Sequence, residues 1–163
     1  MEKQKRRVSH VMPCSVVLLT AGSSAKADVM TATCMFISEE PPLLVVSIDR
    51  KSMTHGLIEE SAEFTLNIAS RGQVGLAKKL GALHGRNVDK LKSLGIATQA
   101  APSVKAPALR GASASIGCRV ITSFPVSRYT LYVAEAIDYA ISGKDSPVAW
   151  YQDRYYTLTD EVR

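Results

Sequence analysis

The sequence predicts a mainly β protein, an antiparallel β-barrel with short helices packed at its ends. Six runs rich in Val, Ile, Thr, Tyr and Phe are bounded by Gly, Pro or Ser clusters, as strands are. The segments with helical spacing are short and do not alternate regularly with these runs, which argues against a doubly wound parallel sheet. The 163 residues, 46% of them apolar, are enough for one domain with a packed core.

The expected strands stop where turn residues appear. The last two runs are the longest, and SFPVSR between them has the composition of a hairpin connection. The predicted strands cover residues 15–21, 33–37, 43–48, 64–68, 115–124 and 130–141.

Three short segments carry apolar residues at helical spacing. Leu57 and Ile58 mark a helix over 53–60, Val74, Ala77 and Leu80 one over 73–80, and Leu91 and Leu94 one over 89–94. The following stretch, 97–110, has no periodicity and contains two prolines. We therefore expect a surface loop or an arm there.

The net charge of +5 is concentrated at the start of the chain. The segment EKQKRR supplies +3 of it, which leaves only +2 for the remainder and argues against a nucleic-acid surface. The expected organisation is a basic N-terminal tail over 1–10 and a single domain over 11–163.

The apolar run VVLLTA after the basic start superficially resembles a secretory signal. It is short, however, and reads better as the first strand of the barrel. No segment approaches the roughly 20 apolar residues of a transmembrane helix. We therefore predict a cytoplasmic protein that binds neither membrane nor nucleic acid.

The three cysteines are Cys14, Cys34 and Cys118. They are odd in number and widely spaced, and no C-x-x-C pattern is present, so neither a disulfide framework nor a metal site is indicated. We expect reduced thiols.

The turn after the third predicted strand is the strongest candidate for anion binding. Ser52 is placed to cap a helix that begins near Met53, which leaves the first backbone N–H groups of that helix facing outward. Lys51 adds a full charge, and Arg50 and the Thr54 hydroxyl lie beside it. The turn could hold a terminal phosphate, or it could be an ordinary capped helix with solvated basic residues.

Three segments carry a family resemblance: VMTATCMFIS, then PPLLVVSI, then RKSMTHGLIEESAEFTLNIAS. With these the chain resembles the flavin reductase-like family, the FMN-binding split barrels that include flavoredoxin. The resemblance continues through GRNVDKLKSLG, VKAPAL and the last two strands, so it covers nearly the whole chain after the first ten residues. It implies a split barrel of the antiparallel Greek-key type.

The resemblance also implies a set of cofactor-binding residues. One group matches the segment that contacts the flavin ring, a second the strand end that approaches the ring, a third the phosphate turn, and a fourth a polar position on the next strand. In that order they are Thr31, Ala32, Thr33 and Cys34; Ser47 and Ile48; Lys51, Ser52 and Thr54; and Asn67.

The chain departs from the family pattern at several positions. Asp28 stands where relatives often have Asn, and its carboxylate would need to face solvent or pair with Lys26. His84 replaces a small hydroxyl residue; it is a weak catalytic candidate, able to contact a phosphate or relay a proton, although a loop histidine without chemical duty is the simpler interpretation. Arg128 and Tyr129 stand where an Asp-His pair is frequent.

The function implied is an FMN-binding oxidoreductase of the flavin reductase type. NAD(P)H would pass hydride to the flavin, and the electrons would go on to free flavin or an acceptor protein. Because G-x-G-x-x-G is absent, the nicotinamide nucleotide would be a transient co-substrate. The compact turn favours FMN over FAD, and the resemblance implies a homodimer with each flavin near the interface.

Two alternatives remain open at this level. One is an FMN-binding electron-transfer protein, flavoredoxin-like, without nicotinamide activity. The other is a flavin-free binding module that uses its basic tail on an acidic partner.

Overall fold

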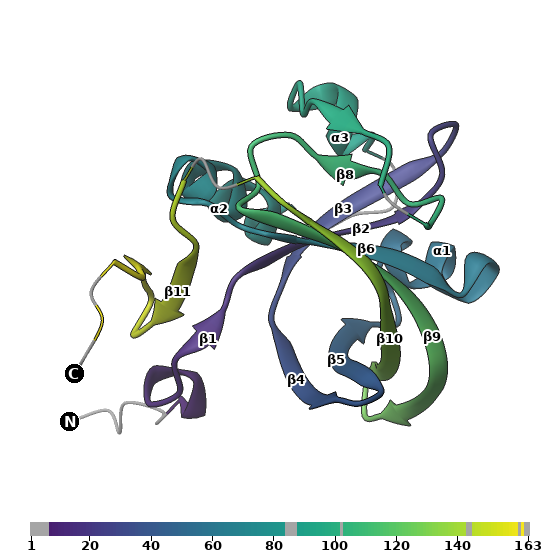
Figure 1. Ribbon diagram of the computed structural model, residues 1–163, viewed down its shortest axis with the longest axis horizontal. Coiled ribbons are helices and arrows are strands. Elements are labelled where there is room, and N and C mark those ends of the chain that lie inside the picture. Colours follow the sequence, from purple (N-terminus) through teal and green to yellow (C-terminus); the bar gives the residue numbers. More distant parts are fainter. Residues whose placement is uncertain (1–6, 84–87, 102, 143–144, 160, 162–163) are drawn as a thin grey trace.

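A seven-stranded antiparallel sheet in the order β3-β2-β6-β9-β10-β5-β4 curls into a barrel (Figure 1). The computed structural model describes residues 7–83, 88–101, 103–142, 145–159 and 161. The strands of this sheet are β2 (Val17–Gly22), β3 (Ala27–Ala32), β4 (Cys34–Glu39), β5 (Pro42–Asp49), β6 (Glu63–Ile68), β9 (Ala114–Val126) and β10 (Tyr129–Ile141). The predicted mainly β antiparallel barrel is confirmed.

The hairpin of β9 and β10 has 13 residues in each strand. Its turn is Ser127 and Arg128, and Ser127 adopts a left-handed φ of 53°. The predicted hairpin is confirmed, although β9 reaches Val126 and so extends beyond the predicted end at 124.

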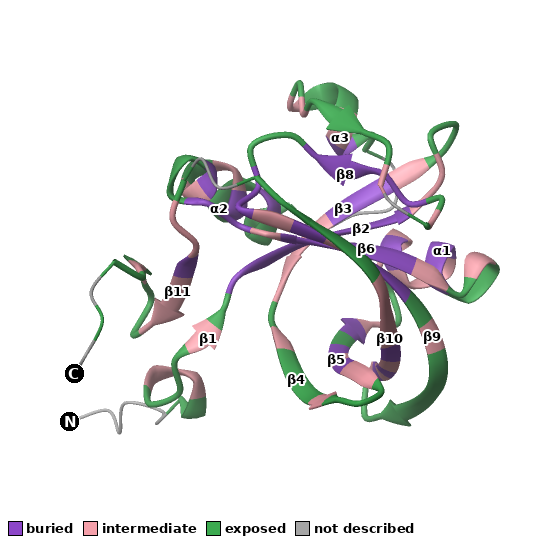
Figure 2. Ribbon diagram, viewed as in Figure 1, coloured by how far each residue is buried: buried purple, intermediate pink, exposed green. Residues whose placement is uncertain are grey.

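β2 separates two hydrophobic clusters. Val17 and Leu19 face the barrel interior, where they join Ile48, Phe64 and Tyr132. Leu18 faces the opposite side, in a cluster completed by α2 and other elements outside the barrel. Because both faces of β2 are covered, residues 17–21 are all buried, and its sequence does not alternate between apolar and polar (Figure 2).

The helices are short, as predicted. α1 spans Met53–Ser61, α2 spans Val74–Ala82 after the 3₁₀ turn Arg71–Gln73, and α3 is a single turn at Lys90–Ser93 capped by Asp89. None of the helices in the described part of the chain has the length and apolar content needed to cross a bilayer.

An arm beside the barrel carries both ends of the chain (Figure 1). It is a three-stranded sheet of β1 (Cys14–Ser15), β11 (Val148–Tyr151) and β12 (Arg154–Thr157). Before it, Val8–His10 form a 3₁₀ turn, and His10 Nε2 lies 2.8 Å from Asp153 Oδ2. Residues 1–6 lie outside the described residues, so the basic tail over 1–10 stays a prediction.

The prediction of a surface loop over 97–110 is wrong for its second half. β7 (Thr98–Gln99) pairs with β8 (Ala108–Leu109), and Ala106, Ala108 and Leu109 are buried. Buried threonines explain this: Thr65 donates its hydroxyl to Ala106 O at 2.7 Å, and Thr20 donates to Pro107 O. Hydroxyl groups on β2 and β6 thus donate to the carbonyl oxygens of Ala106 and Pro107, which precede β8 and have no partner strand.

Candidate functional site

The turn between β5 and α1 has the predicted helix cap. Ser52 Oγ accepts a hydrogen bond from His55 N at 3.1 Å, and Asp49 holds the turn through its carbonyl and carboxylate, which accept from Ser52 N and Lys51 N, each at 3.0 Å. Within the described part of the chain, nothing accepts from the backbone N–H of Met53, which is half-buried at the helix start. This donor, with the helix dipole behind it, suits an anion.

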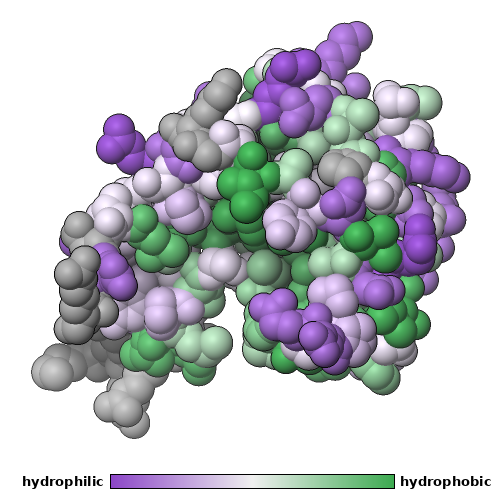
Figure 3. Space-filling model, in the orientation of Figure 1, coloured by the Kyte–Doolittle hydropathy of each residue, from purple (hydrophilic) through white to green (hydrophobic). Residues whose placement is uncertain are grey.

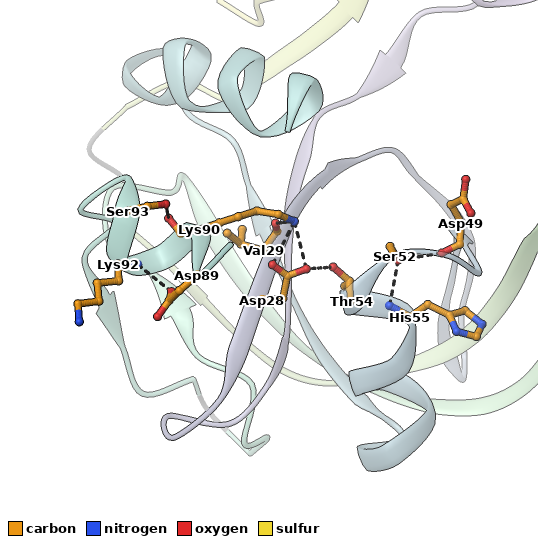
Figure 4. Close-up of polar contacts among 10 residues, drawn as sticks. All are labelled: Asp28, Val29, Asp49, Ser52, Thr54, His55, Asp89, Lys90, Lys92 and Ser93. Carbon is orange, nitrogen blue, oxygen red and sulfur yellow. Dashed lines mark hydrogen bonds and ion pairs between the residues drawn. The ribbon is translucent and has the colours of Figure 1, made fainter. Parts of the chain in front are cut away.

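Thr54 differs from its expected role. The residue is buried, and its hydroxyl donates to Asp28 Oδ2 at 2.6 Å (Figure 4). A hydroxyl has one proton, so the Thr54 side chain cannot also donate to a phosphate. Thr54 is therefore part of the support behind the turn, and the backbone N–H of the half-buried Met53 is the donor left at the helix start.

Asp28 forms a buried ion pair that the sequence did not reveal. Lys90 Nζ lies 3.1 Å from each carboxylate oxygen of Asp28 and donates to Val29 O at 2.9 Å. The expected alternatives, exposure to solvent or pairing with Lys26, are both wrong, because the partner comes from α3, 62 residues away. The pair fastens α3 to β3 and, through Thr54, to the start of α1.

The predicted ring-contact segment lies where β3 ends and β4 begins. Thr31 donates its hydroxyl to Ala77 O at 2.7 Å, Ala32 ends β3, and Thr33 is exposed. Cys34 begins β4 and is held by Ser15, whose Oγ donates to Cys34 O at 2.9 Å. Burial raises the pKa of the Cys34 thiol, so this group stays protonated at neutral pH.

β3 connects the two candidate regions. Its residue Asp28 touches Thr54 of α1, and Ala32 lies four residues further along the same strand. At roughly 3.3 Å per residue, these two points are about 13 Å apart. The start of α1 and the predicted ring-contact segment therefore lie along the same strand.

The remaining predicted residues divide between surface and core. Ser47 is exposed on the outer face of β5, whereas Ile48 is 0% exposed and packs in the barrel interior. Asn67 is also 0% exposed: it donates to Leu18 O and Thr20 Oγ1, and its Oδ1 accepts from Leu109 N and Ser115 Oγ. All its hydrogen-bonding capacity is used inside the protein, so we reassign Asn67 from cofactor contact to core structure.

The backbone of His55 takes part in the helix cap, whereas its imidazole points to β10. His55 Nε2 lies 2.9 Å from Thr130 Oγ1 and 4.0 Å from Glu59 Oε1, which joins α1 to β10. Tyr132 donates to the same carboxylate, and burial together with Glu59 raises its pKa. His84 lies outside the described residues, so its assignment stays a prediction.

The outer face of the barrel around Ser47 is apolar. Cross-strand register places Met35, Val45 and Val133 in one row and Ser47, Leu131 and Phe124 in the next. Met35 is 63% exposed and Phe124 51% exposed. Figure 3 shows hydrophobic surface along the notch between the arm and the barrel. We call the six residues of these two rows the outer barrel face.

An antiparallel barrel with this strand order is the fold of the FMN-binding split barrels. The chain belongs to the flavin reductase like domain family, whose sequence model matches residues 8–159. The predicted family and fold are confirmed.

Among curated proteins, the FMN reductase (NADH) RutF of Variovorax paradoxus is 20% identical over 142 residues, 87% of this chain and 77% of that protein. Among solved structures, flavoredoxin of Desulfovibrio vulgaris matches with a TM-score of 0.86 at 23% identity, covering 100% of this chain and 96% of that one. The NADH:FAD oxidoreductase SgcE6 of Streptomyces globisporus matches with a TM-score of 0.83 at 20% identity, covering 98% and 96%. At such identities the structural matches establish the fold alone.

Proposed function

We propose that the protein is an FMN-binding oxidoreductase of the flavin reductase type, which takes electrons from NAD(P)H and passes them to free flavin or to an acceptor protein. The observation that carries this proposal is the α1 turn: a capped helix start at which the backbone N–H of Met53 has no acceptor among the described residues, tied through Thr54 to the strand that leads to the predicted ring-contact segment. The family membership and the FMN reductase (NADH) relatives support it.

Each part of the turn has a task in binding. The N–H of Met53 offers a fixed donor to the phosphate, Ser52 keeps the helix start in place, and the exposed residue Lys51 supplies an ammonium group beside it. The hydrogen bond between Thr54 and Asp28 holds the start of α1 against β3. The Arg50 guanidinium donates to Ser127 O and so links the turn before α1 to the β9–β10 turn.

The ring would rest against the β3–β4 crossing. Ala32, Thr33 and Cys34 offer backbone groups at a strand end, and the Ser47 hydroxyl lies on the outer barrel face. When bound, FMN supplies the two-electron chemistry, and the protein positions it and tunes its potential. The absence of an acid-base pair in the sequence is therefore no objection.

The outer barrel face supports a homodimer as part of the same proposal. An exposed apolar face on the sheet, with Ser47 within it, would be covered by the same face of a second copy. This arrangement would place each flavin close to the interface. Replacing Phe124 by Glu should then yield monomers in light scattering after size exclusion, while Tyr139→Glu, at an exposed position further along β10, should leave the mass unchanged.

A second candidate is an FMN-binding electron-transfer protein without nicotinamide activity. The match to flavoredoxin over the whole chain favours considering it. Both functions use the same turn and ring segment, so only reactivity separates them. The predicted cytoplasmic location belongs to both proposals.

Anaerobic mixing tests the proposed function. Protein loaded with FMN is mixed with NADH or NADPH while the flavin absorbance is followed. Bleaching with either donor supports the reductase. Stable absorbance with both, together with bleaching by dithionite, would reject it in favour of the electron carrier.

A further inference from the structure

A buried charge pair lies directly behind the start of α1. Lys90 Nζ is 3.1 Å from each carboxylate oxygen of Asp28, and Thr54 donates its hydroxyl to Asp28 Oδ2 at 2.6 Å (Figure 4). Asp28 is 1% exposed, Lys90 6% and Thr54 0%. Bulk water therefore cannot compensate either charge, and each charge depends on the other.

This pair is close to the donor that is proposed to bind the FMN phosphate. Met53, whose backbone N–H has no acceptor among the described residues, directly precedes Thr54 in α1. One residue step and one hydrogen bond separate this N–H from the Asp28 carboxylate, so the carboxylate lies within about 10 Å of a phosphate bound there. Salt screens a buried charge over such a distance only weakly.

The net charge of the pair decides which field a phosphate meets at the turn. The ion pair of Lys90 and Asp28 is neutral as a whole. Without the ammonium group, the remaining carboxylate would repel a phosphate dianion and oppose the attraction of the Met53 N–H and the helix dipole. A flavin that has no phosphate would not meet this repulsion.

Lys90 also fixes the position of the carboxylate. Its ammonium group donates to Val29 O at 2.9 Å as well as to Asp28, so two neighbouring residues of β3 hold it. Thr54 uses its one hydroxyl proton on the same carboxylate. Direct contacts therefore run from α3 through β3 to the residue that follows Met53.

We infer that Lys90 is a positioning residue for the flavin phosphate: by neutralising Asp28, it allows the start of α1 to select a phosphorylated flavin over an unphosphorylated one. Lys90 acts on the phosphate through Asp28 and Thr54. The inference rests on the proposed function, because it takes the start of α1 as the phosphate site.

A series of charge variants tests the inference, with the ratio of the riboflavin Kd to the FMN Kd as the readout. Both constants are measured by quenching of flavin fluorescence. Lys90→Met leaves the pair with a negative charge, Asp28→Asn leaves it with a positive charge, and the double variant is neutral like the parent. The ratio should fall about tenfold in Lys90→Met, rise in Asp28→Asn and return to the parent value in the double variant.

The double variant also separates charge from support. Its new amide oxygen can still accept from the Thr54 hydroxyl, so the start of α1 keeps its contact with β3. Lys92→Met removes an exposed lysine from the same helical turn and is the matched control, which should leave the ratio unchanged. If Lys90→Met does not fold, Asp28→Asn and the double variant still decide, since the first must exceed the parent ratio and the second must match it.

A purely structural role of the pair would weaken the binding of both flavins alike. A constant ratio across the series, or a ratio in Asp28→Asn at or below the parent value, would therefore overturn the inference. A different result marks failure of the proposed function: the parent protein would then bind riboflavin as tightly as FMN, or would bind neither.

Discussion

The start of α1 and the surroundings of Asn67 use the same kinds of polar group in opposite ways. At the start of α1, Ser52 satisfies one backbone N–H, and that of Met53 has no acceptor among the described residues. Around Asn67, each donor and acceptor of the amide is matched inside the core. Both regions read as polar sites in the sequence, but only the first has donors left for a ligand.

The difference teaches that donor availability, rather than residue type, separates a binding turn from a structural network. Buried polar groups must be paired, so a fully buried amide in a well-packed sheet makes its hydrogen bonds within the protein and has none left for a ligand. A helix start at the surface keeps orphan N–H groups by geometry, whatever its side chains are.

The largest effect is expected from the buried ion pair behind the turn. Lys90→Met leaves the Asp28 carboxylate, which is 1% exposed, without its cation, and should cost about 3–5 kcal/mol in the free energy of unfolding measured by urea titration. The double variant Asp28→Asn with Lys90→Met should recover much of this loss. Lys92→Met on the exposed side of the same helical turn is the control and should change stability little. Equal stability of Lys90→Met and the parent protein would show that the pair is not a structural tie.

The next effect concerns Asn67. Asn67→Ala leaves the buried Leu109 N–H and the Ser115 hydroxyl without the acceptor that they share, at a cost of about 1–3 kcal/mol for an unsatisfied buried group. The folded fraction should retain its FMN affinity, measured by fluorescence quenching of FMN. A loss of FMN affinity without loss of stability would show that Asn67 contacts the cofactor.

The turn itself should show the reverse pattern. Lys51→Ala should weaken FMN binding by about 1–3 kcal/mol, the range for a charge-assisted contact, and leave the urea midpoint unchanged. Lys78→Ala on α2 is the matched control, because this lysine lies over the Tyr155 ring rather than at the turn. Unchanged FMN affinity in Lys51→Ala would place the phosphate elsewhere.

The smallest effect at neutral pH concerns Cys118. Burial raises the pKa of this thiol from 9.0 to about 12. Below pH 9 both folded and unfolded chains keep the proton, but between pH 9 and about 12 the unfolded chain releases it first, so stability should fall as pH rises through this window. Cys118→Ala should show a shallower decline than the parent and than Cys14→Ala. Identical slopes in all three proteins would contradict the shift.

The local pattern of the sequence predicts most strands of the barrel and the helix cap at Ser52. The β9–β10 hairpin and Ser52 are recognisable because turn residues and a capping hydroxyl act on their immediate neighbours. β3 was missed, since ADVMTA mixes buried and half-buried residues without clean alternation. Two of its residues, Thr31 and Ala32, were nevertheless named as ring contacts through the family resemblance.

The partners of the site residues were beyond sequence reasoning. Asp28 meets Lys90 and Thr54, and Asn67 meets Leu109 and Ser115, through contacts 26 to 62 residues apart. Such pairs follow from sheet order and register, which no local pattern contains. Ser15, which holds Cys34, was missed for the same reason, although a serine at the start of the first predicted strand was visible.

The most direct test of the account compares FMN with riboflavin, which has the same ring and ribityl chain but no phosphate. We predict that FMN binds about 10–100-fold more tightly than riboflavin, as expected for charge-assisted phosphate contacts, and that Lys51→Ala narrows this difference. Equal affinity for the two ligands in the parent protein would contradict the assignment of the α1 turn as the phosphate site.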